Sequence, residues 1–253
     1  MKMFDLSGRI AIVTGGNRGI GFSISRGLAE AGATVVIANR HAEEGEKAAA
    51  SLLGAGLKAV AIPLDVTSDA SIQKMTAEVV RKFGKIDILV NNAGIVIRKK
   101  AEDYTPQDWE AIMDTNLRGM FFCCQEVGRE MMRQGKGKII NIGSVVSVVA
   151  QSERGVYAIS KAGVAHLTRS LALEWAKYRI NVNAIGPGAT LTDINRTYLK
   201  EHPEVLQAFI NDIPMGRIGH PDDCAGAAVF LASDASDFIT GQLILIDGGM
   251  TIH

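Results

Sequence analysis

The sequence predicts a doubly wound α/β fold, in which a parallel sheet is covered by helices on both faces. Short runs rich in β-branched residues alternate with longer helical patterns along all 253 residues. The short runs are apolar and lack polar alternation, which is typical of strands buried on both sides. Because no Pro/Ser-rich linker, repeat or low-complexity block interrupts this alternation, we expect residues 1–253 to form a single domain.

Strands are expected where a short apolar run stands between turn-forming residues. These runs are Ile10–Val13, Thr34–Ala38, Lys58–Ile62, Ile86–Val90, Lys138–Ile142, Ile180–Ala184 and Leu243–Ile246. Helices are expected where the intervening segments show helical apolar spacing. The first two predicted helices end near Glu30 and Leu53. The later ones cover about Ser71–Phe83, Trp109–Arg133, Val156–Lys177, Asp193–Asp212 and Pro221–Ala232.

The composition argues against several classes of protein. Lys+Arg and Asp+Glu number 27 each, so no basic face for nucleic acid is expected. Residues 1–9 lack an apolar signal core, and no apolar run approaches the ~18 residues of a membrane span. The three cysteines and five histidines show no disulfide or metal-ligand spacing. We therefore expect a cytoplasmic protein without a metal site, nucleic-acid partner or membrane partner.

A glycine-rich turn follows the first strand, with Gly15, Gly19 and Gly21 in the spacing G-x-x-x-G-x-G. Glycines let the backbone approach a pyrophosphate closely, and the N-terminus of the following helix offers unpaired N–H groups. Because this turn joins a strand directly to a helix, it indicates a Rossmann-like dinucleotide site.

The end of the second strand bears on the choice of cofactor. An acidic residue here would bond a ribose 2′-hydroxyl and repel a 2′-phosphate, but the sequence has Asn39 and Arg40. With Arg18 in the glycine-rich turn, two cations and no carboxylate favour NADP(H) over NAD(H). The alternative is that Arg40 only begins a solvated helix, since exposed arginine is the norm.

Polar residues also follow the third and fourth strands. Asp65 stands where the adenine edge is expected, and Asn91 and Asn92 close the fourth strand ahead of Gly94. Adjacent amides at the end of an apolar strand either tie neighbouring backbone together or contact the cofactor.

Three residues suited to proton transfer follow the fifth strand. Ser144 ends this strand, while Tyr157 and Lys161 stand one turn apart on one face of the next helix. A tyrosine pKa near 10 is too high for a base at neutral pH, but a nearby lysine cation lowers it. Ser144 can donate a hydrogen bond to a substrate oxygen as charge develops there.

Together these motifs resemble the short-chain dehydrogenase/reductase family, and the resemblance covers essentially the whole chain. The matching pieces, in family order, are Thr14-Gly15-x-x-x-Gly19-x-Gly21, Asn91-Asn92-Ala93-Gly94, Asn116, Ser144, Tyr157-x-x-x-Lys161, Gly186-Pro187-Gly188 with Thr192, and Asp247-Gly248-Gly249. The resemblance implies that Tyr157 is the acid/base, that Ser144 binds the substrate oxygen, and that Lys161 holds the nicotinamide ribose. It also implies that Asn116 positions a water, and that the protein is a homotetramer built through the long helices and the last strand.

Spacing and resemblance together predict the cofactor-binding residues. They are Gly15, Asn17, Arg18, Gly19, Ile20, Gly21, Asn39, Arg40, Asp65, Val66, Asn92, Ala93, Gly94, Tyr157, Lys161, Pro187, Gly188, Thr190 and Thr192. The expected function is an NADP(H)-dependent oxidoreductase that interconverts a ketone and a secondary alcohol. A nucleotide-binding sensor without catalysis is disfavoured, because the catalytic residues are all present.

The substrate pocket is expected between residues 95–103, residues 145–155 and a lid at about 188–213. Arg98, Lys99 and Lys100 in the first segment, and Gln151, Glu153 and Arg154 in the second, could recognise a carboxylate or polyol. The basic residues are similar to those of gluconate and deoxygluconate dehydrogenases of this family. A solvated charged loop is the alternative, and an oxoacyl-thioester or broad-specificity carbonyl reductase remains open.

Overall fold

The computed structural model describes residues 2–252, except for the side chains of 193–195 and 198. Its centre is a parallel seven-stranded sheet with the order β3-β2-β1-β4-β5-β6-β7. The strands are β1 (Ile10–Thr14), β2 (Thr34–Asn39), β3 (Lys58–Pro63), β4 (Ile88–Asn91), β5 (Gly137–Ile142), β6 (Ile180–Pro187) and β7 (Leu243–Ile246). The predicted α/β fold is confirmed, and strand order reverses between β1 and β4, where such folds bind ligands.

Two strand boundaries differ from the prediction by more than one residue. The fourth strand begins at Ile88 instead of Ile86, because the Ile86 backbone exchanges hydrogen bonds with the Gln134 side chain. The sixth strand continues to Pro187 instead of ending at Ala184, because β7 pairs with it over Ala184–Pro187. The extension carries the chain directly into the Gly186-Pro187-Gly188 motif.

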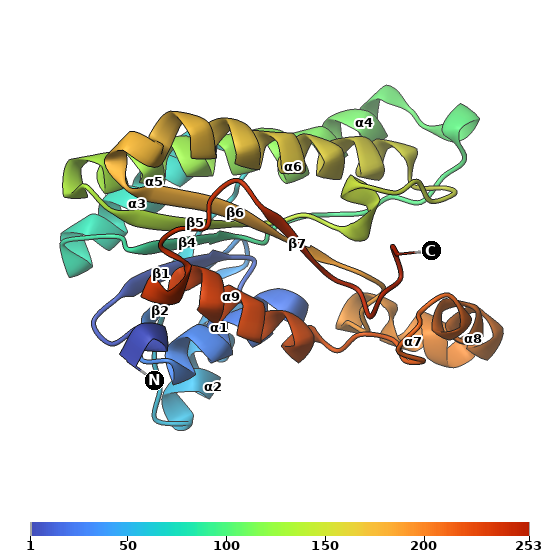
Figure 1. Cartoon of the computed structure of the whole chain (residues 1–253), viewed down its shortest axis with the longest axis horizontal. Coiled ribbons are helices and arrows are strands. Elements are labelled where there is room, and N and C mark those ends of the chain that lie inside the picture. The colour runs from blue at the N-terminus through green and yellow to red at the C-terminus, as the bar shows by residue number, and fades with distance from the viewer. Residues whose placement is uncertain (1, 253) are drawn as a thin grey trace.

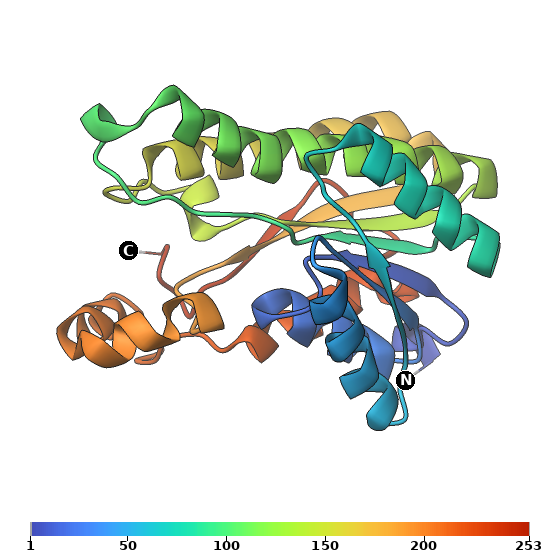
Figure 2. The ribbon, with the colours of Figure 1, turned by 180° about the vertical axis from the view of Figure 1, so that it is seen from behind.

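Helices cover both faces of the sheet (Figures 1 and 2). One layer consists of α3 (Asp69–Phe83), α4 (Pro106–Met113), α5 (Gly119–Gln134) and α6 (Gly155–Trp175), and the other of α1 (Gly19–Glu30), α2 (Ala42–Gly54) and α9 (Ala225–Ala232). Successive strand residues point to opposite faces. In β1, Ile12 therefore packs with the first layer, and Val13 packs with the second.

The predicted long helix over Trp109–Arg133 is interrupted. It begins earlier, at Pro106, because Thr105 and Asp108 form a capping box ahead of α4. Between α4 and α5 the chain forms a π-helical turn, Asp114–Arg118. Such turns are rare and occur often at functional sites, and this one contains the buried Asn116.

The predicted helical insertion near residues 193–212 consists of α7 (Asp193–Glu201) and α8 (Pro203–Asn211). Both helices project beyond the sheet (Figure 1). The last predicted helix begins with a 3₁₀ turn, Pro221–Cys224, before α9. Among residues 2–252, no helix has the length and apolar character needed to span a bilayer.

Candidate active site

The predicted site residues gather along the carboxyl edge of the sheet. The glycine-rich turn follows β1, Arg40 follows β2, and Asp65 follows β3. Ala93 and Gly94 follow β4, and Ser144 follows β5. Because all strands are parallel, these segments meet at one edge, with Tyr157 and Lys161 contributed by α6 and Asn116 by the π-helical turn.

The glycine-rich turn has the geometry of a phosphate cradle. Gly19 has φ +53°, and a Cβ on Gly21 would lie 2.2 Å from the Gly15 carbonyl oxygen, so these positions favour glycine. Arg18, the N-cap of α1, makes no side-chain capping hydrogen bond. The first N–H groups of α1 can therefore bind a phosphate, and the turn fits the pyrophosphate of a dinucleotide.

The amides at the end of β4 hold this edge together. The Asn92 side chain donates hydrogen bonds to the carbonyl oxygens of Thr14 and Gly15, at 3.1 and 3.0 Å. The Asn91 side chain donates to Asn141 at 2.9 Å. The predicted tying role is thus confirmed for both amides. Thr14, which the sequence placed in the glycine-rich motif without a role, accepts hydrogen bonds on its hydroxyl from the backbone of Asn92 and Ala93.

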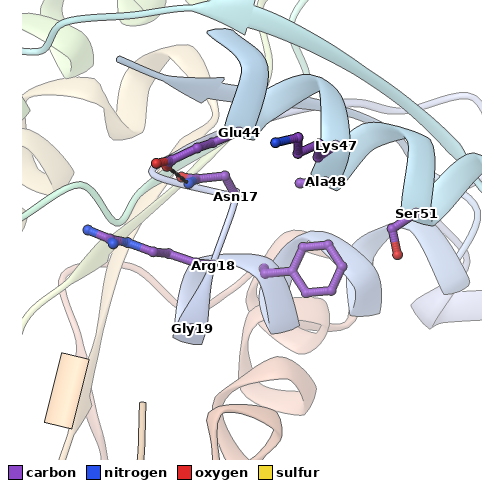
Figure 3. A pocket seen from close by; sticks show the side chains of 8 residues that line it. Asn17, Arg18, Gly19, Glu44, Lys47, Ala48 and Ser51 are labelled. Atoms are coloured by element: carbon purple, nitrogen blue, oxygen red, sulfur yellow. Dashed lines mark hydrogen bonds between the residues drawn. The ribbon is translucent and has the colours of Figure 1, made fainter. Parts of the chain in front are cut away.

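The part of the site where the sequence predicts the ribose lies between α1 and α2 (Figure 3). A pocket of about 460 Å³ is lined here by Asn17, Arg18, Gly19, Phe22, Glu44, Lys47, Ala48 and Ser51. Asn17 donates a hydrogen bond of 2.8 Å to Glu44, a residue that the sequence reasoning missed. Arg18 and Arg40 are exposed. The buried Asn39 instead donates to the His41 carbonyl oxygen, so it fixes the start of α2.

Three further predicted cofactor residues have structural contacts of their own. Asp65 accepts hydrogen bonds from the backbone and hydroxyl of Thr67, which lower its pKa, and the Arg40 charge lowers it further. Val66 belongs to the buried core, and Ile20 packs against the core of the opposite layer. Any contact of Val66 and Ile20 with a cofactor is thus expected to come mainly from their backbone.

Asn116 is buried and reaches back toward the end of β4. Its side chain donates to the Ile95 carbonyl oxygen at 2.9 Å and accepts from the Ile95 N–H at 2.8 Å. It also donates to the Ser160 hydroxyl at 3.2 Å. A Cβ on Gly94 would lie 3.2 Å from the Asn116 Oδ1 and 3.7 Å from the Lys161 Nζ. The structure therefore brings Gly94, Asn116 and Lys161 together.

Ser144, Tyr157 and Lys161 form the centre of the site. The Ser144 hydroxyl lies close enough to Tyr157 to lower its pKa, and the Lys161 Nζ lies 5.7 Å from the Tyr157 ring centroid. Lys161 is fully enclosed and donates to the Ile142 carbonyl oxygen at 2.7 Å. Ser147, which the sequence reasoning missed, donates to the Lys161 carbonyl oxygen and accepts from the Ser144 N–H.

Burial dominates the electrostatics of this centre. It raises the pKa of Tyr157, while the Ser144 hydrogen bond and the Arg154 charge lower it. It also lowers the pKa of Lys161 to about 8. The sequence predicts that Lys161 lowers the tyrosine pKa. In these residues alone the lowering comes from Ser144 and Arg154, and burial outweighs both, so the pKa of Tyr157 is raised.

The segment after β6 closes the other side of the site. Gly188 donates its N–H to the Ile246 carbonyl oxygen at 3.0 Å, and the Thr190 hydroxyl donates to the Gly188 carbonyl oxygen at 3.1 Å. Thr192 carbon atoms lie 3.7 Å from the position of a Cβ on Gly19. The Pro187–Thr192 segment therefore faces the glycine-rich turn, as a segment shared by a dinucleotide would.

The two predicted substrate segments are joined to each other. The Lys99 N–H donates to the Glu153 carbonyl oxygen at 3.1 Å, and the Tyr104 hydroxyl donates to the Ile97 carbonyl oxygen at 2.7 Å. Lys99 is paired with Asp108, and Arg154 is half-buried beside Tyr157. Across the described residues, no group of three His, Cys, Asp or Glu side chains could hold a metal ion.

Comparison with known proteins agrees with this geometry. Residues 15–251 match the family model described as enoyl-(acyl carrier protein) reductase. The chain is 39% identical to gluconate 5-dehydrogenase of Gluconobacter oxydans, with 99% of this chain and 97% of that protein covered. It is also 39% identical to NAD-dependent glycerol dehydrogenase of Listeria innocua, with 99% and 97% covered.

A solved structure gives the same picture. The gluconate 5-dehydrogenase of Burkholderia cenocepacia, in complex with NADP and tartrate, has 42% identity and a TM-score of 0.96, with 100% of this chain and 98% of that chain covered. Since the matches span the chain from the glycine-rich turn to the last strand, the chain belongs to the short-chain dehydrogenase/reductase family of NAD(P)-dependent enzymes that interconvert ketones and secondary alcohols.

Proposed function

We propose that this protein is an NADP(H)-dependent dehydrogenase/reductase for a polyhydroxylated substrate, either a sugar acid or a polyol. The observation that carries the proposal is the meeting of Asn116, Ser144, Tyr157 and Lys161 beside the glycine-rich turn. Relatives named for gluconate, deoxygluconate, glycerol and threitol support the substrate class. An oxoacyl-thioester or broad-specificity carbonyl reductase is the competing assignment.

Tyr157 is assigned the proton transfer. In the reductive direction its hydroxyl donates a proton to the substrate oxygen, and in the oxidative direction the tyrosinate accepts one. The Ser144 hydroxyl donates a hydrogen bond to the same oxygen as negative charge develops on it. When bound, the nicotinamide supplies or accepts the hydride.

Lys161 and Asn116 are assigned supporting roles. The Lys161 ammonium, 5.7 Å from the Tyr157 ring centroid, is assigned the stabilisation of the tyrosinate when cofactor and substrate are bound, and the binding of the nicotinamide ribose. Asn116 is assigned the positioning of a water in the proton relay. Its place on a π-helical turn supports this role, because that turn interrupts the regular helical hydrogen-bond pattern.

The preference for NADP(H) rests on Arg18 and Arg40, together with the absence of a carboxylate directly after β2. Several similar solved structures are described with bound NADP, which agrees with this choice. The glycerol dehydrogenase relative is named as NAD-dependent. Membership of the family therefore does not fix the choice between NAD(H) and NADP(H), and the proposal for this chain rests on its own residues.

Two structural predictions accompany the function. Residues 188–213, with α7 and α8, are proposed to act as the substrate lid of the single domain, because they extend over the edge where the site residues gather. A homotetramer is proposed through α4, α5, α6 and the last strand. Apolar side chains exposed on and near these elements support it, namely Trp109, Phe121, Ile159, Leu173 and Phe238. The cytoplasmic location stays a prediction from the sequence.

The proposal is tested by following NADPH and NADH consumption with a panel of ketones. The panel contains 5-ketogluconate, an acetoacetyl thioester and simple aryl ketones. We expect NADPH-linked turnover to be fastest with the keto sugar acid. Faster turnover of the thioester or the aryl ketones would transfer the assignment to the competing class, and no turnover with any ketone would overturn it.

A further inference from the structure

We propose that Arg154 is the anion-binding residue of the substrate pocket, where it receives a carboxylate about one helical turn away from the Tyr157 hydroxyl. This inference rests on the proposed function and narrows it, because it selects an acid over a neutral polyol. It follows from the position of Arg154, the partners of its guanidinium and the charges around it.

The backbone of Arg154 is fixed by the helix that follows it and by the residue that precedes it. It is the N-cap residue of α6, three residues before Tyr157. Its predecessor Glu153 has φ 59°, a left-handed conformation that is uncommon for a residue other than glycine. The Glu153 carbonyl oxygen accepts a hydrogen bond from the Lys99 N–H, so the neighbouring loop fixes this backbone. The guanidinium is thus presented from a defined position.

The partners of the guanidinium leave its charge uncompensated. Arg154 is half-buried and donates a hydrogen bond of 2.5 Å to the neutral Gln151 side chain. Within the described part of the chain, no carboxylate lies at ion-pair distance from it. By contrast, the buried Lys138 lies 2.7 Å from Asp237, and Lys99 in the neighbouring loop is paired with Asp108. A partly desolvated charge without a counter-ion is costly unless a ligand supplies one.

The charges around Arg154 also favour an anion. Burial lowers the pKa of Arg154, and the nearby Arg98 lowers it further, while Tyr157 raises it. The only cation among these influences is thus another guanidinium, carried by the exposed loop that follows β4. Two guanidiniums that lie close enough to influence each other suit a carboxylate, because each can donate two parallel hydrogen bonds. Arg154 is the more enclosed of the two and is the main binding residue.

Binding at Arg154 has a consequence for the proton transfer. The Arg154 charge lowers the pKa of Tyr157, against the larger effect of burial. A carboxylate seated on Arg154 offsets this charge, so Tyr157 holds its proton more firmly when an acid is bound. This favours the protonated tyrosine that ketone reduction requires.

The test measures binding, so that it does not depend on turnover. Gluconate and the neutral polyol sorbitol are titrated into the NADPH-bound protein by calorimetry. NADPH is the reduced cofactor and cannot oxidise an alcohol, so neither molecule is turned over during the titration. We expect R154Q to weaken gluconate binding by about 10- to 100-fold and sorbitol binding by less than about threefold, as removal of a charged hydrogen bond predicts. R154K should recover part of the loss because it keeps the charge.

Lys74→Gln is the matched control, because it removes an exposed cation from α3, outside the two substrate segments, and should change gluconate binding by less than about twofold. Equal weakening of gluconate and sorbitol in R154Q would indicate a structural role and overturn the proposal. So would unchanged gluconate binding, or a wild-type protein that binds both molecules equally well. If no ketone of the panel is reduced but gluconate still binds in a way that depends on Arg154, the proposed reaction is rejected and the role of Arg154 is kept.

Discussion

The cations at the two ends of the ligand-binding edge differ in their surroundings. Lys161 and Arg154, near the reacting atoms, are wholly or partly buried, and within the described residues neither has a carboxylate at ion-pair distance. Arg18 and Arg40, near the expected ribose, are exposed. Carboxylates also lie nearby, since Asn17 is bonded to Glu44, and the Arg40 charge reaches Asp65.

This difference shows where charge has most effect. A buried cation interacts through a medium of low effective dielectric constant, so it can shift the pKa of Tyr157 or hold an anion strongly. An exposed cation is screened by water and salt, so it adjusts affinity by a modest factor. We therefore expect large effects from changes at the buried end and smaller effects at the exposed end.

The largest effect is expected at the buried end from Tyr157→Phe. This change removes the hydroxyl that transfers the proton but keeps the ring, so kcat should fall by about 10²- to 10⁴-fold. The Kd for NADPH should change by less than about threefold, as fluorescence titration can show. Tyr178→Phe is the matched control near the other end of α6 and should leave kcat within about twofold. Near-normal turnover in Tyr157→Phe would show that Tyr157 is not the acid/base.

A second large effect at the buried end concerns stability. Burial lowers the pKa of Lys161 from 10.5 to about 8 in the folded protein. Below pH 8 the lysine is charged in both states, and the folded state carries the cost of burying that charge. Between pH 8 and 10.5 the unfolded chain binds more protons, so the contribution of Lys161 to the free energy of unfolding rises with pH.

Lys161→Met removes this pH dependence. The free energy of unfolding of the variant minus that of the wild type should therefore fall by about 2 kcal/mol in total between pH 8 and 10. Urea unfolding without added cofactor measures this difference. Lys74→Met, at an exposed position of α3, should give a difference that is flat with pH. A flat difference for Lys161→Met as well would show that burial does not depress its pKa.

At both ends, the features that the sequence predicted are those that local spacing determines. The glycine-rich turn, Ser144, Tyr157 and Lys161 were found because they stand at strand ends or one helical turn apart, so local spacing fixes their positions. The seven strands were found because each is a short apolar run. These features depend on contacts within a few residues, and the structure confirmed the strands with shifts of a few residues at their ends.

The features that the sequence did not predict depend on distant contacts. The π-helical turn at Asn116 has an ordinary helical sequence, and its position is tied to Ile95 and Ser160. The contact of Asn17 with Glu44 joins two helices that are separated by β2. Nor could the sequence separate Arg154 from Lys99, because only the fold pairs Lys99 with Asp108.

The smallest effect is expected at the exposed end, where Arg40→Asp replaces a cation with an anion beside the expected 2′-phosphate. The ratio of kcat/KM for NADPH to that for NADH should fall roughly tenfold at low salt, since a charged hydrogen bond is lost and a repulsion is gained. Because Arg40 is exposed, the change should shrink as salt increases. Lys74→Asp makes the same charge change on the opposite layer and should leave the ratio unchanged. If Arg40→Asp also leaves it unchanged, Arg40 does not read the 2′-phosphate, and Arg18 becomes the residue that carries the preference.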